Sequence, residues 1–444
     1  MKTVGIIAEY NPFHSGHQYQ IAMARRLTGA DFVVVVMSGD FVQRGEPAVF
    51  DKYTRTAMAL EGGADLVLEM PVRFATSSAE DFAACGVALL DRLGVTDVLC
   101  FGSELGRLDL LEQAAGILAA EPEAFRQKLR QGLAAGMSFP KAREAALVRE
   151  LEACGLKEKG QDDWQKVLSS PNNILGIEYL KALKRRGSRI SPLTVRRQGQ
   201  DYHDTRLLPE DNRFFPSASA IRKAYRDAAC PGWSGPVSQD PSGTGWSGPG
   251  SQDPSGAGCN GSGGTRPTVP VPIFPDDLSG LLDARLLELS RQNQDLTRFA
   301  DVSPELAARI RRNLLEFDTF SGRIARLKTR RLPYTRISRA LVHILLGITA
   351  EEISVSRSLD YAPYIRILGF RKAAGDLLGA IRRQCPLPMV TRTAGALRQM
   401  EDSPAMDMLY QDICASHLYQ SLVFHKSGGR MKNEYTQPVV IRHL

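Results

Sequence analysis

The order of strand-like and helix-like segments in the first 110 residues is the feature that most restricts the fold. Short apolar segments typical of buried parallel strands occur at Val4–Ala8, Phe32–Met37, Leu66–Glu69 and Val98–Phe101. Helices are predicted between them, over residues 17–28, 51–62 and 78–93, with Asp51 and Ser78 as N-caps of the second and third. Because strand–helix–strand connections are right-handed, this order predicts a doubly wound, Rossmann-like α/β domain with a parallel sheet.

The α/β pattern extends to about residue 227. Further helices are predicted at Leu108–Ala120, Glu123–Gly132, Ala142–Gly155 and Asn173–Arg186, followed by a strand at Leu193–Arg196. Doubly wound sheets bind ligands at the carboxyl ends of their strands. We therefore predict one α/β domain over residues 1–227, with its ligand site at that edge of the sheet.

Residues 228–270 interrupt the pattern with a tandem repeat. Trp233–Gly245 and Trp246–Gly258 are almost the same 13-residue segment, rich in Gly, Ser and Pro and nearly free of aliphatic residues. Such a composition buries too little apolar surface to offset the entropy of ordering. The segment is predicted to be a disordered insert.

Residues 271–444 are predicted to form a mainly helical, basic domain, with a strand at Tyr364–Leu368 and a helix at Asp407–Val423. Residues 301–400 contain 18 Lys and Arg against 8 Asp and Glu, whereas residues 1–150 contain 15 against 19. A basic region joined to an acidic one indicates a polyanionic partner. The alternative is a solvated helical surface with no such partner.

Several classes of protein are disfavoured by composition. No apolar run reaches the roughly 18 residues of a membrane helix, and the N-terminus lacks a signal-peptide pattern. The seven cysteines are scattered without a CxxC motif, which disfavours a disulfide framework and a zinc site. We expect a cytoplasmic protein without membrane contact, and the sequence does not indicate its oligomeric state.

The strongest motif follows the first predicted strand, where His14 and His17 flank Gly16 and Asn11-Pro12 sets the preceding turn. A parallel sheet presents a helix N-terminus to phosphate at this point, and the glycine allows close approach of a ligand. Two imidazoles can donate hydrogen bonds to a departing pyrophosphate. A structural turn and a metal pair are the alternatives, but HxxH has no evident third ligand nearby, so no metal site is predicted.

This motif resembles the HIGH-type signature shared by nucleotidylyltransferases and class I aminoacyl-tRNA synthetases. The second signature of that superfamily is a Ser/Thr-rich loop before a helix that carries an arginine. Residues 215–222, FPSASAIR, are similar to it, with Ser217, Ser219 and Arg222 in the matching places. An ordinary helix N-cap is the alternative for this segment. The resemblance implies the HUP/nucleotidylyltransferase type of Rossmann-like fold and attack on the α-phosphate of ATP.

Longer blocks resemble one family more closely. GIIAEYNPFHSGH, MSGDFVQRGEPAVFDKYTR, GADLVLEMP, PNNILGIEYLKAL and YTRISRALVHILLGI are similar to the bacterial tRNA(Met) cytidine acetate ligases along nearly the whole chain outside the insert. The resemblance implies that ATP, with Mg²⁺, activates acetate as acetyl-adenylate. The wobble cytidine of elongator tRNA(Met) then becomes N4-acetylcytidine.

The resemblance also implies site residues, with His14 and His17 as the catalytic pair. Asn173 is the expected ATP contact and Asn172 the helix cap, while Arg196 and Arg197 remain alternatives for one ATP-binding arginine. Ser15 stands where the family more often has Asn. The full expected ATP-binding set is Ile7, Ala8, Glu9, Tyr10, Asn11, Pro12, Phe13, His14, Ser15, Gly16, His17, Gln18, Tyr19, Gln20, Gly102, Asn173, Arg196, Arg197, Ser217, Ser219 and Arg222.

Other charged residues support weaker hypotheses. Arg44 or Arg55 is a candidate to pair with the acetate carboxylate; these two, and their neighbours Asp40, Glu46 and Lys52, are equally plausible as ordinary loop or helix-surface charges. His343 is expected to be a core residue. Contacts to tRNA phosphates are expected from Arg309, Arg311, Arg312, Arg326, Lys328, Arg330 and Arg331.

Two other functions remain open at this point. A small-molecule adenylyltransferase of coenzyme biosynthesis would have the same two signatures, but it gives no reason for the basic region. A non-catalytic RNA-binding protein on a nucleotide-binding fold has no need to keep His14, His17 and the Ser/Arg loop. Transfer of acetate to tRNA distinguishes all three.

Overall fold

The computed structural model describes residues 1–153, 155, 164, 167–168, 170–197, 217–228, 270–401 and 403–443. Residues 229–269 of the predicted repeat insert lie outside the described residues. So do residues 215 and 216 of the FPSASAIR segment.

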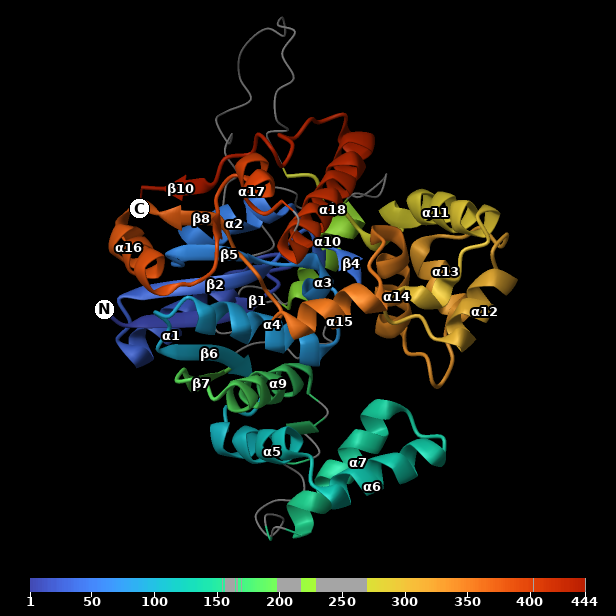
Figure 1. Cartoon of the computed structure of the whole chain (residues 1–444), viewed down its shortest axis with the longest axis horizontal. Helices are drawn as coiled ribbons and strands as arrows, with labels where there is room; N and C mark the ends of the chain where they lie inside the picture. The colour runs from blue at the N-terminus through green and yellow to red at the C-terminus, as the bar shows by residue number, and fades with distance from the viewer. Residues whose placement is uncertain are drawn as a thin grey trace, which may run out of the picture.

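An eight-stranded sheet forms the centre of the described structure, in the order β10-β8-β5-β2-β1-β6-β7 with β9 paired to β8 (Figure 1). Neighbouring strands are parallel except β5 and β8, which are antiparallel. The strands are β1 (Thr3–Ala8), β2 (Phe32–Ser38), β5 (Leu66–Met70), β6 (Val98–Ser103), β7 (Ser191–Arg196), β8 (Ile365–Arg371), β9 (Met389–Val390) and β10 (Val440–Arg442). A separate hairpin pairs β3 (Phe41–Val42) with β4 (Glu46–Pro47).

Helices cover both faces of the sheet, as the doubly wound prediction requires. Successive side chains of β2 alternate between two cores: Val33 and Val35 pack with α1 (Ser15–Thr28) and α2 (Lys52–Glu61), whereas Val34 and Val36 pack with α4 (Ala79–Arg92) and α9 (Pro171–Arg186). This alternation is the two-residue period of a strand that is buried on both faces. The predicted fold class is confirmed for this part of the chain.

Local capping explains where the first helices begin. Asp51 accepts hydrogen bonds from the backbone N–H groups of Tyr53 and Thr54 (both 3.0 Å), and Ser78 accepts one from Asp81 (3.3 Å), so both predicted N-caps are confirmed. Helix α1 begins at Ser15, before the predicted residue 17, because the imidazole of His14 serves as its N-cap.

The sheet continues into the part of the chain that was predicted to be a separate helical domain. The predicted strand at Tyr364–Leu368 is present as β8, but it pairs with β5 and so extends the α/β sheet, with β10 on its other side. A buried ion cluster fixes it there: Lys52 Nζ lies 2.8 Å from Glu69 and 3.2 Å from Glu434, and Arg366 Nε lies 2.9 Å from Glu69. The predicted boundary at residue 271 therefore has to be corrected, because both sides of it share one sheet.

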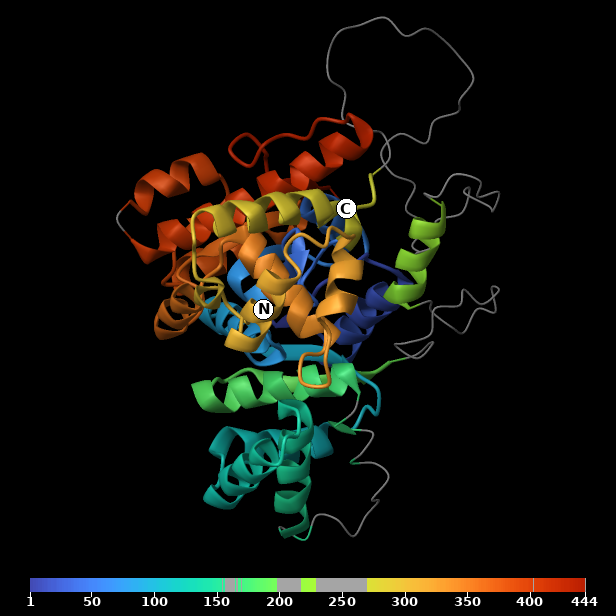
Figure 2. The same cartoon turned by 90° about the vertical axis from the view of Figure 1, so that its right-hand side faces the viewer.

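Two groups of helices lie outside the layers that cover the sheet. A hairpin of α6 (Glu123–Ala134) and α7 (Phe139–Ala153) projects from α5 (Leu108–Ala120) and α9, and a helical unit lies apart from it, beside the sheet edge (Figures 1 and 2). That unit contains α11 (Ser279–Arg291), α12 (Pro304–Arg312), α13 (Phe320–Leu327) and α14 (Tyr334–Leu346). The others are α3 (Val72–Ala75), α10 (Ala218–Ala228), α15 (Ala350–Ser358), α16 (Gly375–Gln384), α17 (Thr393–Gln399) and α18 (Pro404–Ser427).

The helices of the described residues and the buried His343 bear on two more of the predictions. None of their helices is long and apolar enough to cross a membrane. His343 is fully buried in α14, and its ring contacts Thr76 and the carbonyl of Ala300 (both 3.1 Å), which confirms the predicted core position.

Candidate active site

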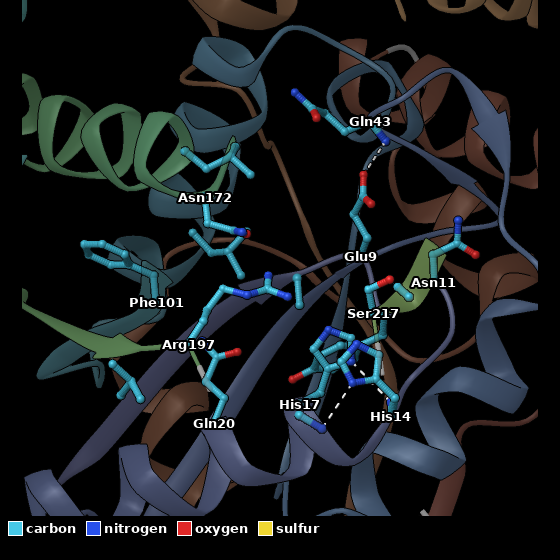
Figure 3. A pocket seen from close by; sticks show the side chains of 18 of the residues that line it. Glu9, Asn11, His14, His17, Gln20, Gln43, Phe101, Asn172, Arg197 and Ser217 are labelled. Carbon is cyan, nitrogen blue, oxygen red and sulfur yellow. Dashed lines mark hydrogen bonds between the residues drawn. The ribbon is translucent and has the colours of Figure 1, made fainter. Parts of the chain in front are cut away.

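The turn from β1 to α1 holds two stacked imidazoles whose ring centroids are 3.7 Å apart (Figure 3). His14 Nδ1 accepts a hydrogen bond from the backbone N–H of Gly16 (3.1 Å). His17 Nδ1 accepts one from the backbone N–H of His14 (3.3 Å). A nitrogen that accepts carries no proton, so each neutral ring has its proton on Nε2. Both rings line one pocket, and each offers it an N–H donor.

Electrostatics keep both imidazoles neutral at physiological pH. Burial lowers the pKa of His14 to about 3, helped by the positive charges of Arg197 and Arg222. Burial also lowers the pKa of His17 well below its ordinary value, with smaller contributions from His14 and Arg197. Neutral donors in a basic pocket suit the binding of phosphate oxygens, because they stabilise negative charge without proton transfer.

The N-terminus of α10 forms the second wall of the pocket. Ser217 Oγ caps this helix by accepting a hydrogen bond from the backbone N–H of Ala220 (3.1 Å). Arg222 donates to the carbonyl oxygen of Asn11 (2.7 Å) and to Ser219 Oγ (3.2 Å). The two signatures recognised in the sequence are therefore joined by a direct hydrogen bond, and a helix N-terminus with an arginine is a general anion site.

The carboxyl end of β6 and the start of α9 form the third wall of the pocket. The predicted N-cap of α9 is wrong here. Ser170, not Asn172, is the N-cap of α9, because Pro171 occupies the first helical position that its fixed φ favours. Asn172 consequently lies within the helix and lines the pocket. Asn173 is fully buried, and its Oδ1 accepts a hydrogen bond from the backbone N–H of Glu104 (3.0 Å). Asn173 thus supports the wall from behind.

The two candidate arginines at the end of β7 have different surroundings. Both line the pocket, together with Gly102. The aliphatic part of Arg196 packs against Gly106, where a Cβ atom would lie 2.8 Å from Arg196 Cβ. Arg197 extends into the pocket in Figure 3 and lowers the pKa of both histidines. Arg197 is therefore the arginine whose charge acts on the two histidines.

The β3–β4 hairpin closes the pocket on the side of β2. The carboxylate of Glu9 accepts a hydrogen bond from the backbone N–H of Gln43 (2.9 Å), and burial raises the pKa of Glu9 while Arg44 opposes this effect. Arg44 lines the pocket. Arg55 is fully buried and donates to the carbonyl oxygens of Glu9, Ser38, Gly39 and Phe50. Arg55 is thus excluded as a partner for acetate, and it holds the ends of β1 and β2 together.

Most of the expected ATP-binding set lines this pocket. The members that do are Ile7, Ala8, Glu9, Tyr10, Asn11, His14, Gly16, His17, Tyr19, Gln20, Gly102, Arg196, Arg197, Ser217, Ser219 and Arg222. Pro12, Phe13, Ser15, Gln18 and Asn173 are not among the lining residues. Phe13 is instead buried against the ring of Tyr10, and Gln18 is exposed on the outer face of α1.

Other residues line the pocket without having been recognised from the sequence. They are Gln43, Phe82, Phe101, Leu175, Tyr179, Val195 and Ala218. Most are apolar or aromatic, and such residues in a strand or helix look the same in sequence whether they face a core or a ligand. Gln43 was detectable in principle, since it follows a predicted strand at the ligand edge.

The pocket's donors suit a nucleotide that brings its own metal ion. No group of three His, Cys, Asp or Glu side chains that could hold a metal occurs among the described residues. Glu9 is the one carboxylate among the lining residues that the structure describes. Magnesium keeps several waters and binds mainly through substrate phosphates plus one or two carboxylates, so this lining fits it.

The predicted tRNA contacts fall into two groups in the helical unit. Arg309 donates to the carbonyl oxygens of Leu327 and Arg326, Arg311 lies 3.7 Å from Asp295, and Arg326 forms ion pairs with Asp318 and Glu316. Exposed cations for which the described residues provide no hydrogen-bond or ion-pair partner are Arg312, Lys328, Arg330 and Arg331. The four side chains of the second group are therefore more accessible to a phosphate ligand than the three of the first group.

The family model of the HIGH nucleotidyl transferases matches residues 1–434. A tRNA(Met) cytidine acetate ligase of Acetivibrio thermocellus is 35% identical over 441 residues, which cover 99% of this chain and 100% of the relative. The chain belongs to the tRNA(Met) cytidine acetate ligase family. A second member, from a Thermoanaerobacter species, is 36% identical over 440 residues, with 99% and 100% covered.

Solved structures of the family have the same fold. The apo crystal structure of Thermotoga maritima TmcAL matches with a TM-score of 0.85 at 28% identity, and all of both chains is covered. The same protein bound with alpha-thio ATP matches with a TM-score of 0.81 over the same coverage. The fold and family inferred from the sequence blocks are therefore confirmed.

Proposed function

We propose that this protein is an ATP-dependent tRNA(Met) cytidine acetate ligase, which joins acetate to the wobble cytidine of elongator tRNA(Met) in the cytoplasm. The observation that carries the proposal is the pair of neutral imidazoles at the start of α1, in one pocket with Arg197, Arg222 and the N-terminus of α10. This set offers N–H donors and two positive charges to the oxygens of a triphosphate.

The first step is attack of an acetate oxygen on the α-phosphorus of ATP. The new O–P bond forms as the bond to the β-phosphate oxygen breaks, and pyrophosphate leaves with the electron pair. Negative charge grows on the leaving oxygen, and the Nε2–H groups of His14 and His17 stabilise it together with Arg222. A magnesium ion brought by ATP would be held by the nucleotide's own phosphates, with Glu9 as the lining carboxylate nearest to hand, and would neutralise part of the same charge.

Arg44 is the residue that we assign to the acetate carboxylate. It lies beside Glu9 at the β2 side of the pocket, and the other candidate, Arg55, is held by backbone carbonyls. A guanidinium binds a carboxylate through two parallel hydrogen bonds, which orients one oxygen for attack. The apolar lining, including Phe82 and Phe101, restricts water that would hydrolyse the acetyl-adenylate.

The second step transfers the acetyl group to RNA. The exocyclic N4 amine of cytosine attacks the acetyl carbon, the C–O bond to AMP breaks, and the amine loses one proton. AMP leaves with the oxygen that originally belonged to acetate. The wobble base has to leave its stack to reach the pocket, which a single-stranded anticodon loop allows at little cost.

Incubation with ATP, labelled acetate and unmodified elongator tRNA(Met) tests the proposal. After digestion of the RNA, we expect the label in N4-acetylcytidine, with one pyrophosphate and one AMP released for each acetyl group. A transcript with uridine at the wobble position is the matched control and should remain unlabelled. Adenylation of a small metabolite, with no label in RNA, would instead identify a coenzyme-biosynthesis enzyme.

A further inference from the structure

A second groove lies between two segments that are far apart in sequence. Its walls are the α6–α7 hairpin and the loop of residues 328–333 that joins α13 to α14, and its volume is about 1460 Å³. In Figures 1 and 2 this loop points from the helical unit toward the hairpin. Lys141 lines the groove from α7, while Arg330 and Arg331 line it from the loop.

The two walls meet at the turn between α6 and α7. Gly136 has a φ of +83°, and a Cβ atom at this position would lie 3.4 Å from Nη2 of Arg331. The glycine thus permits a turn that residues with side chains rarely adopt, and the guanidinium lies directly over it. The hairpin is consequently placed next to two of the cations expected to contact tRNA.

The groove combines cations with exposed apolar side chains. Lys141, Arg330 and Arg331 outnumber the two lining carboxylates, Glu144 and Glu152. Met137 lines the groove at the hairpin turn and is 46% exposed, while Phe139, the first residue of α7, is 52% exposed just outside the groove lining. Surfaces that bind single-stranded nucleic acid pair cations for the phosphates with flat or apolar side chains for the bases.

The groove is also connected to the ATP pocket. The loop of residues 328–333 leads directly into α14, where Ser338 Oγ donates to the carbonyl oxygen of Gly45 (2.6 Å). Gly45 belongs to the β3–β4 hairpin, which contributes Gln43 and Arg44 to the pocket. The groove and the ATP pocket are therefore linked through α14 and the β3–β4 hairpin.

We propose that the α6–α7 hairpin is a second RNA-binding element, which holds the tRNA backbone in this groove opposite Arg330 and Arg331. The proposal rests on the proposed function, since it assigns the RNA substrate of the same enzyme to a surface outside the helical unit. Lys141 contacts phosphate, and Met137 and Phe139 contact bases or sugars. Glu144 weakens binding by repelling the same backbone.

Two substitutions of equal charge on α7 test the proposal in the full-length enzyme. Lys141→Gln removes a groove cation, whereas Arg149→Gln removes an exposed cation of the same helix that does not line the groove. We expect Lys141→Gln to weaken binding of unmodified elongator tRNA(Met) and to lower the log–log salt slope by about 0.7 to 0.9. Arg149→Gln should leave both unchanged, and Glu144→Gln should strengthen binding.

A footprint on the wild-type enzyme provides a measurement that does not depend on a variant. Bound tRNA should protect Lys141 from an amine-acetylating reagent, while the exposed Lys184 of α9 stays reactive. An unprotected Lys141, or a wild-type salt slope in Lys141→Gln, would overturn the proposal even if tRNA is acetylated normally. A wild-type enzyme that acetylates no tRNA would overturn the proposed function with it.

Discussion

Replacement of His14 by asparagine or by glutamine should separate the two functions of its ring, helix capping and donation to the ligand. Nδ1 of His14 caps α1 through the backbone N–H of Gly16, which leaves Nε2–H as the donor for the nucleotide that we propose in the pocket. An asparagine oxygen replaces the Nδ1 acceptor, whereas a glutamine amide reaches the place of Nε2. His14→Asn is therefore expected to keep the cap and lose the donor, and His14→Gln to do the reverse.

The expected magnitudes follow from these two bonds. Loss of an N-cap acceptor costs about 1 kcal/mol, so His14→Asn should exceed His14→Ala in free energy of unfolding by about that amount. Both substitutions remove the ring, so the difference between them isolates the cap. Loss of one donor to a developing oxyanion lowers kcat by roughly 100- to 1,000-fold, so both variants should be nearly inactive.

Denaturant titration and steady-state acetylation of tRNA measure these two effects separately. His14→Gln should be less stable than His14→Asn but more active, and tRNA affinity should stay at the wild-type level in all three variants. Wild-type turnover in His14→Asn, or an order of activities with asparagine above glutamine, would refute the assignment of Nε2–H as the catalytic donor.

Four more outcomes are expected. Deletion of Trp233–Gly258 should leave the melting temperature and ATP binding unchanged in a thermal-shift assay, because the repeat has little apolar surface to contribute to a core. Replacement of Arg330 and Arg331 by Gln should lower the tRNA salt slope by about 1.4 to 1.8, whereas Arg326→Gln, which removes an ion-paired side chain, should change it less. Arg44→Lys should raise KM for acetate roughly tenfold, about 1.4 kcal/mol, with KM for ATP unchanged. Because burial lowers the pKa of both active-site histidines, turnover should not fall between pH 8 and pH 6. Below about pH 6.5 the unfolded chain binds more protons at these two histidines than the folded protein does, so the free energy of unfolding should decrease as the pH falls further in an equilibrium-unfolding series.

Much of the fold was predictable because its signals are local. Buried strands such as Phe32–Ser38 are short β-branched runs, and Asp51 and Ser78 are ordinary capping residues. The pairing of β8 with β5 was not predictable, since it depends on contacts between residues about 300 positions apart. The ion cluster of Lys52, Glu69, Arg366 and Glu434 that fixes this pairing looks like scattered surface charge in the sequence.

The functional site was likewise predictable where its signals are local in sequence, and not where they depend on the folded structure. His14, His17 and the Ser217–Arg222 segment were recognised because their spacing in sequence is part of the motif. Arg44 and Arg55 could not be distinguished, because only the structure reveals that Arg55 is surrounded by four carbonyl oxygens. Asn172 and Asn173 are adjacent, and a helix that begins two residues earlier than expected places Asn172 in the pocket lining instead of at the N-cap.

The most direct test of the account follows the oxygen atoms of acetate. With ATP, unmodified elongator tRNA(Met) and acetate labelled with ¹⁸O in both carboxylate oxygens, attack on the α-phosphorus transfers one label to AMP. Mass spectrometry should therefore find one ¹⁸O atom in the AMP released for each N4-acetylcytidine formed, and none in pyrophosphate. Label in inorganic phosphate, or AMP without label, would contradict acetyl-adenylate formation in this pocket.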